Sequence, residues 1–168
     1  MQVLQTQRLT LRRFNLADAP FILRLVNEPS WLEFIGDKGV RSLEDARGYL
    51  RNGPLDMYAR YGFGLWLVAR KEDAAPLGMC GLIKRDALPD VDIGFAFVPE
   101  AWGRGYALES AAAVLAKGRD DFGLKRIVAI TSLDNASSIR VLEKIGLSFE
   151  RVIELNPGDP VRLFACEF

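Results

Sequence analysis

Short runs in which apolar and polar residues alternate, or in which apolar residues follow one another, predict several strands along this chain. The first is "LTLRRF", Leu9–Phe14. Three later runs are separated only by the turn-like segments "EDAAP" and "DALPD", which predicts an antiparallel meander. A buried strand and a closing pair around the turn "NPGDP" follow. These later strands are predicted over Gly64–Lys71, Leu77–Arg85, Asp90–Val98, Arg126–Ser132, Leu147–Leu155 and Val161–Phe168.

Apolar stripes with start and stop signals predict two helices before the meander. In the first, Asn15 or Asp18 can cap the start, the stripe runs through "FILRLV", and Pro29 ends it. The second begins at Ser42, with an acidic residue three positions on that comes close to a capping box. It is predicted to end near Gly53, where a proline follows.

Two more helices are predicted after the meander. One runs from Arg104 to about Phe122, and the other is capped by Asn135 and closed by Gly146. The predicted order is β-α-α-β-β-β-α-β-α-β-β, which is neither a regular alternation nor two segregated halves. We therefore expect a mixed α/β fold, with a mixed sheet and helices on both faces, in a single domain over residues 1–168.

Composition excludes several classes of protein. The 22 basic and 22 acidic residues give no net charge, which argues against a nucleic-acid-binding protein. The chain has no histidine, so hydrolase mechanisms that pair serine or cysteine with histidine are excluded. Cys80 and Cys166 lack metal or redox spacing, and we expect no metal. Neither a signal segment nor a membrane span is predicted, and a cytoplasmic protein is the default.

The segment "VPEAWGRGYALESA" is the strongest candidate for a binding site. A predicted strand runs through Gly103-Arg104-Gly105 into an alanine-rich helix. Backbone N–H groups at the start of a helix are open and positively polarised, so an anion binds there. Glycine has no Cβ, so a phosphate can approach the chain closely. A tight turn without a ligand is the alternative interpretation.

Two common phosphate-binding loops do not match this segment. The P-loop requires Gly-Lys-Ser or Gly-Lys-Thr, and neither tripeptide occurs in the chain. The dinucleotide fingerprint requires a third small residue, where this chain has Leu108. Its acidic residue would be Asp134, which lies too far beyond Gly105.

A third phosphate loop does match. "WGRGYA" resembles the acetyl-CoA loop of the GNAT N-acetyltransferases, Gln/Arg-x-x-Gly-x-Gly/Ala, with Gly105 and Ala107 in the small-residue positions. Trp102 replaces the Gln or Arg, as in the RimJ/RimL-like branch. "QRLTLRRFNLADA" resembles the opening strand and helix of that branch. "NASSIRVLEKIGLSFE" is similar to its second CoA motif, although Leu147 and Ser148 interrupt the expected Gly-Phe.

The resemblance implies a GNAT-type acyl-CoA N-acyltransferase fold with a mostly antiparallel mixed sheet. It implies direct transfer of an acetyl group from acetyl-CoA to an amine, with no covalent enzyme intermediate. The strand before the loop would lie along the pantetheine arm, and one of its amides could polarise the thioester carbonyl. The residues implied to bind the cofactor are Phe97, Val98, Trp102, Gly103, Arg104, Gly105, Tyr106, Ala107 and Asn135.

Two catalytic residues are proposed by the same resemblance. Asp92, at the start of the strand that ends at Val98, is the candidate base for the acceptor amine. The alternative is an acid on a solvated strand end. Ser138, in the matched Asn-x-x-Ser motif, is the candidate proton donor to the CoA thiolate. The alternative is a hydroxyl on a helix surface or in a cap.

The acceptor stays open between a protein N-terminus and a small amine. Trp31, Phe34, Gly36, Tyr58 and Tyr61 either line an acceptor cleft or pack the first helices against the sheet. A non-catalytic acyl-CoA sensor or scaffold is the rival function. The expected partners are the amine alone, with neither nucleic acid nor membrane, and the protein is expected to be a monomer or a homodimer.

Overall fold

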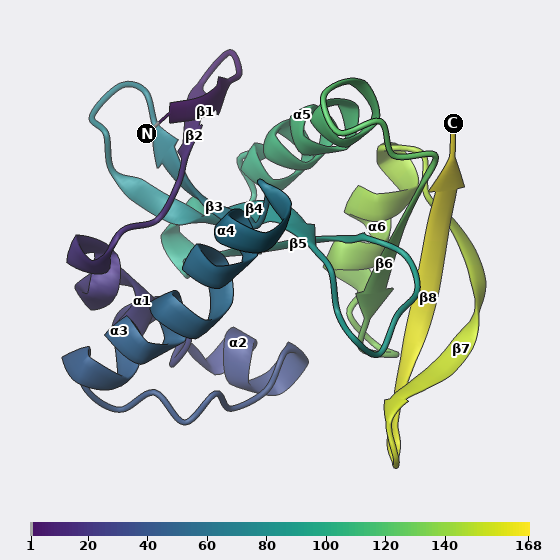
Figure 1. Cartoon of the computed structure of the whole chain (residues 1–168), viewed down its shortest axis with the longest axis horizontal. Helices are drawn as coiled ribbons and strands as arrows, with labels where there is room; N and C mark the ends of the chain where they lie inside the picture. The colour runs from purple at the N-terminus through teal and green to yellow at the C-terminus, as the bar shows by residue number, and fades with distance from the viewer. Residues whose placement is uncertain (1) are drawn as a thin grey trace.

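A computed structural model describes residues 2–168, and one sheet of eight strands runs through it. The strand order is β1-β2-β3-β4-β5-β6-β8-β7, and every neighbouring pair is antiparallel except β5 and β6 (Figure 1). The predicted meander is confirmed as β3, β4 and β5. The strands are β1 Gln2–Gln5, β2 Leu9–Arg12, β3 Leu65–Arg70, β4 Pro76–Ile83, β5 Asp92–Phe97, β6 Arg126–Thr131, β7 Ser148–Asn156 and β8 Asp159–Glu167.

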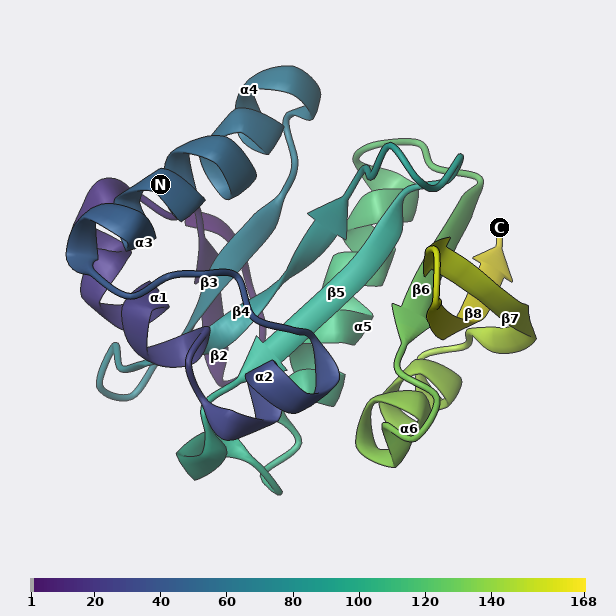
Figure 2. The ribbon, with the colours of Figure 1, turned by 90° about the horizontal axis from the view of Figure 1, so that it is seen from below.

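Helices cover both faces of this sheet, as predicted. The short helices α1 to α4 lie on one face of β2–β5, and the long helix α5 lies on the other, with α6 beside it against β6 (Figure 2). The helices are α1 Ala19–Leu25, α2 Pro29–Phe34, α3 Leu43–Leu50, α4 Asp56–Tyr61, α5 Tyr106–Asp120 and α6 Ala136–Lys144. Short turns of 3-10 helix precede α1 and α5, at Leu16–Asp18 and Pro99–Ala101.

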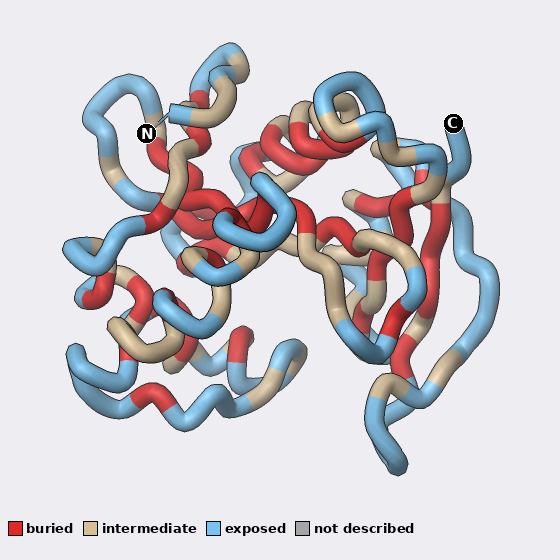
Figure 3. The backbone as a smooth tube through the Cα atoms, in the orientation of Figure 1, coloured by how far each residue is buried: buried red, intermediate tan, exposed pale blue. Residues whose placement is uncertain are grey.

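The main core lies between the sheet and its helices, where the buried parts of the chain gather (Figure 3). Trp66 and Phe164 are among its largest fully buried side chains. A smaller apolar cluster is built on Leu88, Val128, Leu163 and Ala165. There the loop before β5 covers part of β6 and β8. Edge strand β7 is exposed along most of its length.

The structure differs from the sequence prediction in three elements. Strand β1 was not predicted. Helix α1 ends at Leu25, before the chain reaches Pro29, and Pro29 instead begins α2, because proline suits the first turn of a helix, where its missing N–H is not needed. The second predicted helix does not stop near Gly53. A wider π turn over Arg51–Leu55 takes up Pro54 and continues into α4, since the wider turn relieves the clash of the proline ring with the preceding turn.

The predicted helix caps are largely confirmed. Asn15 and Asp18 form a reciprocal capping box at the first turn. The Ser42 side chain accepts from the Asp45 amide, at 3.0 Å, which is half of a capping box. None of the helices within residues 2–168 is long and apolar enough to cross a membrane.

Candidate active site

Strands β5 and β6 meet only at their beginnings. Within the described chain, their one register pair is Asp92 with Val128, reinforced by the Val128 N–H that donates to the Val91 carbonyl at 3.0 Å. Beyond this point the two strands run apart (Figure 2). The edge of β5 that faces β6 is therefore left without a partner strand toward Phe97.

Backbone direction decides which amide of β5 is open. Val98 donates its N–H to the Leu77 carbonyl, at 2.9 Å, so it points toward β4. Residues of an antiparallel strand alternate in direction, so the backbone of Phe97 points the other way, toward β6. Its carbonyl accepts from the indole Nε1 of Trp102, at 3.0 Å, which leaves the Phe97 N–H. Of the two residues predicted to lie nearest the thioester, only Phe97 retains an amide without a partner among residues 2–168.

The glycine turn presents a row of unpaired backbone donors. Gly103 and Gly105 have φ of +72° and +81°, and α5 begins at the next residue, Tyr106. No acceptor within residues 2–168 takes a hydrogen bond from the amides between Gly103 and Leu108. No side chain of the described residues caps this helix start. The predicted anion site is therefore chemically competent, with several N–H groups at the positive end of a helix of 15 residues.

The side chains of the turn contribute less than its backbone. The Arg104 side chain is exposed and turns back, with Nε 3.4 Å from the Glu100 carbonyl. The Tyr106 ring is buried beneath the guanidinium of Arg8, 4.5 Å from its centroid. Tyr106 thus offers only its amide, and Ala107 is half-buried. Arg8 was missed by sequence reasoning, because nothing local to "QRL" points to a helix that starts about a hundred residues later.

The start of α6 carries the second predicted motif. Asn135 caps the helix as predicted, with its Oδ1 accepting from the Ser138 amide at 3.3 Å. The Ser138 hydroxyl is half-buried and makes no hydrogen bond to the described residues. Because β5 and β6 are parallel, the helices that follow them begin at the same end of the sheet. The topology therefore places the α6 start at the same end as the glycine turn.

Asp92 is buried, with 1% of its surface exposed, so its interpretation as an acid on a solvated strand end is wrong. Its Oδ2 accepts from Arg85 Nε at 3.1 Å, and its Oδ1 has no partner among the described residues. Burial raises the pKa of Asp92, and the nearby charge of Arg85 opposes that rise. The Asp92 carboxyl group is therefore hydrogen-bonded to Arg85 through Oδ2, while Oδ1 has no partner among the described residues. Arg85 was not singled out from the sequence.

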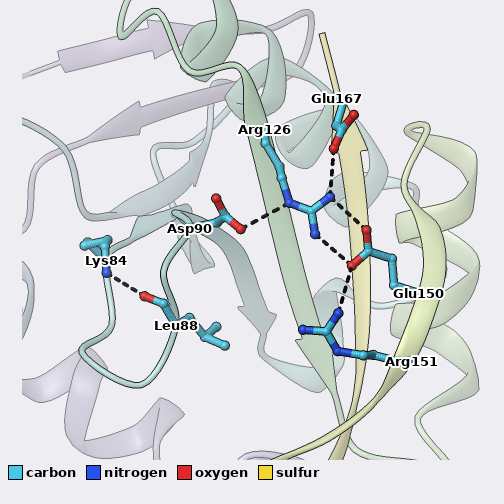
Figure 4. Close-up of polar contacts among 7 residues, drawn as sticks. All are labelled: Lys84, Leu88, Asp90, Arg126, Glu150, Arg151 and Glu167. Carbon is cyan, nitrogen blue, oxygen red and sulfur yellow. Dashed lines mark hydrogen bonds and ion pairs between the residues drawn. The ribbon is translucent and has the colours of Figure 1, made fainter.

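The loop that leads to Asp92 is fixed at both ends (Figure 4). At one end, Lys84 Nζ donates to the Leu88 carbonyl at 2.6 Å. At the other, Arg126 on β6 pairs with Asp90, at 3.1 Å, and also with acids of the last two strands. Those acids are Glu150, at 2.7 Å, and Glu167, at 3.1 Å. The start of β5 is thereby tied to the hairpin of β7 and β8.

The proposed acceptor residues divide into packing residues and surface residues. Trp31 and Tyr58 are buried in the core. The Tyr58 hydroxyl accepts from the Phe14 amide, at 3.1 Å, and donates to the Leu65 carbonyl. For these two side chains the packing interpretation is confirmed. Phe34 and Gly36 are half-buried, and Tyr61 is exposed.

Comparison with known proteins identifies an acetyltransferase domain in this chain. Residues 8–148 match the family model described as acetyltransferase (GNAT) domain. YkkB of Bacillus subtilis is 35% identical over 95 residues, 55% of each chain. The uncharacterized N-acetyltransferase YnaD of the same organism is 29% identical over 145 residues, 86% of this chain and 82% of its own. RimL, a ribosomal L7/L12 α-N-protein acetyltransferase solved with coenzyme A, superposes with a TM-score of 0.85 at 18% identity, covering 100% of this chain and 98% of its own.

Gly105→Ala tests the backbone conformation of the turn. The left-handed φ costs a residue with a Cβ about 1–2 kcal/mol, and that Cβ would lie 3.3 Å from Arg8 Nη2. We expect the free energy of unfolding in urea to fall by at least this amount. Gly48→Ala is the matched control, since Gly48 lies inside α3 with open space around it. It should stabilise by about 0.5–1 kcal/mol. Equal effects of the two substitutions on the free energy of unfolding would contradict a left-handed backbone at Gly105.

Proposed function

Because the chain belongs to the GNAT acetyltransferase family, we propose that this acyltransferase moves an acetyl group from acetyl-CoA directly to an amine, within a ternary complex. One observation carries the proposal: the row of unpaired amides between Gly103 and Leu108 at the start of α5, beside the open edge of β5. A phosphate-bearing, extended cosubstrate matches both features. No metal is invoked in the reaction.

The diphosphate of CoA would bind to the amides of the turn. A hydrogen bond to a charged group contributes roughly 1.5–3 kcal/mol, and the helix dipole adds about 0.3–1 kcal/mol. Several amides acting together are therefore needed, and the turn offers them. Gly103, Arg104, Gly105, Tyr106 and Ala107 contribute through their backbones. The exposed Arg104 side chain can also pair with an outer phosphate, in addition to the bond from its Nε to the Glu100 carbonyl. Trp102 is exposed beside the turn, where it can cover the cofactor.

The pantetheine arm would take the place of a strand along the open edge of β5. The Phe97 N–H, which β4 does not use, can donate to the thioester oxygen as negative charge develops on it. Val98 supports this geometry indirectly, by fixing the strand direction through Leu77. Asn135, at the start of α6, would meet the cofactor directly or through water in addition to capping its helix.

Asp92 would accept the proton of the acceptor amine at Oδ1, the oxygen that Arg85 leaves free. The amine nitrogen then attacks the carbonyl carbon, the carbon–sulfur bond breaks, and the nitrogen releases its second proton as the amide forms. The CoA thiolate takes up one proton in the same step. The Ser138 hydroxyl is our candidate donor, since it can pass its proton to the sulfur and regain the one that the nitrogen releases. An α-amino group, with a pKa of about 7.7–8.0, is partly neutral at pH 7, whereas a lysine amine, at about 10.4, almost never is. Asp92 therefore has to remove a proton from a larger share of lysine amines than of α-amines, so an α-amine is the easier acceptor.

The acceptor class is defined by this chemistry only as a primary amine. RimL, a structural neighbour, is named for acetylating the α-amine of a ribosomal protein. A screen for the acceptor should therefore include peptides with a free N-terminus as well as small amines. A cytoplasmic location and a monomeric or homodimeric state stay predictions.

The activity is tested by incubating the protein with acetyl-CoA and a panel of peptides, amino acids and polyamines. We expect release of the CoA thiol, with a gain of about 42 Da on one acceptor, the net addition of C2H2O when an acetyl group, C2H3O, replaces one amine hydrogen. Tight acetyl-CoA binding with no turnover across the panel would instead favour the acyl-CoA sensor.

Titration with CoA tests the cofactor site itself. The amide NMR signals of residues 103–108 should shift with saturation, because these N–H groups exchange water for phosphate oxygens. The amides of β7, on the far edge of the sheet, serve as the internal control. Shifts confined to other parts of the chain would contradict the assignment.

Asp92→Asn tests the base. In the wild-type enzyme kcat/KM should rise with pH along an acid limb whose midpoint lies above the usual Asp value of about 3.9, since burial raises the pKa of Asp92 and the base acts when ionised. The variant should lose that limb, and its kcat/KM should fall by about 10²- to 10⁴-fold.

Asp90→Asn is the matched control for this substitution. It removes a carboxylate two residues away that pairs with Arg126, and we expect it to keep the pH profile. An Asp92→Asn profile that matches the wild type across about pH 5 to 9 would remove Asp92 from the mechanism.

A further inference from the structure

Glu109, in the first turns of α5, is held by the turn between β1 and β2. Its Oε2 accepts from Thr6 Oγ1 at 2.5 Å and from the Arg8 amide at 2.9 Å, and its Oε1 accepts from Arg8 Nε at 2.7 Å. Although partial burial works in the opposite direction, these bonds lower the pKa of Glu109. The carboxylate is therefore ionised at neutral pH.

The guanidinium of Arg8 extends from this carboxylate to the glycine turn. It lies over the ring of Tyr106, 4.5 Å from the centroid. Its Nη2 is 3.3 Å from the position that a Cβ on Gly105 would occupy. One arginine thus contacts Tyr106 and Glu109 in the first turn of α5 and lies near the cap residue Gly105.

Two requirements conflict at the start of α5: the helix start has to be fixed, and its amides have to stay unpaired. A helix start is usually fixed by a Ser, Thr, Asp or Asn side chain that accepts from one of the first amides. Such a cap would occupy a donor that the diphosphate needs. Here Gly105 provides no cap, and the amides stay unpaired within the described chain. The helix start is held from the side instead.

We propose that Arg8 and Glu109 are positioning residues for the diphosphate site, and that they fix the first turn of α5 while leaving its amides free for CoA. This inference rests on the proposed function. It links the first hairpin of the chain to a turn that lies 101 residues later, from Arg8 to Glu109. Neither residue is assigned contact with the reacting atoms.

Glu109→Gln and Arg8→Met test the pair by steady-state kinetics and by calorimetric titration with CoA. Each should raise KM for acetyl-CoA and Kd for CoA by about tenfold or more, because a misdirected amide loses its phosphate bond. The kcat at saturation should stay within about twofold, since Asp92 and Phe97 are untouched. The double variant should be little worse than either single variant, as expected for residues that act as one unit.

Asp18→Asn is the matched control. It breaks the ion pair of Asp18 with Arg12, which ties the opposite end of β2 to the first helical turn at 2.8 Å. It should lower Tm as the two variants do and leave KM for acetyl-CoA unchanged. A Glu109→Gln enzyme with the Tm loss of this control and a wild-type KM and Kd would overturn the proposal.

Two further experiments distinguish a failure of the positioning role from a failure of the proposed function. Thr6→Val removes one bond to Glu109 and serves if the stronger variants fail to fold, with an expected rise in KM of a few-fold. Amide NMR of Glu109→Gln without CoA should show shifted signals at residues 105–108. Wild-type protein that fails to bind CoA would contradict the proposed function, whereas wild-type binding that every variant retains would contradict only the positioning role.

Discussion

The parallel pairing of β5 with β6, broken off after Asp92 and Val128, is the constraint on which the rest of the structure depends. Parallel strands require a crossover, which α5 provides, and the following helix α6 then begins at the same end of the sheet. In the part of the chain that the structure describes, the missing ladder leaves the inner edge of β5 unpaired beyond Asp92. An open strand edge and two helix starts therefore meet at one end of an otherwise antiparallel sheet.

The work at this end is divided between backbone and side chains. The backbone presents the donors: the Phe97 N–H and the amides that follow Gly103. Side chains hold that backbone from positions where they take no donor away. Trp102 binds the Phe97 carbonyl, and Arg8 with Glu109 holds the first turn of α5. Donors that are fixed in advance need no reorganisation when an anion arrives.

Asp92 occupies the closed end of the same opening, where the two strands still touch. A buried carboxylate with a single ionic partner is unfavourable for stability unless its remaining oxygen finds a donor. Arg85 meets one oxygen only, and the loop between them is fixed by Lys84 and Arg126. The fold thus keeps a buried ionisable residue where an apolar residue would be less costly. Such residues are typical of functional sites.

The sequence by itself determined the strands of the meander, the caps at Asn15 and Asn135, and the glycine turn, because each depends on local periodicity or on a residue's own backbone preference. It did not determine the course of the chain at Pro54, where a wider turn absorbs the proline. Only the tertiary structure decided which amide of β5 is free, that Asp92 is buried against Arg85, and that Arg8 holds the start of α5. These features arise from strand register and from contacts between distant segments, which no local pattern encodes.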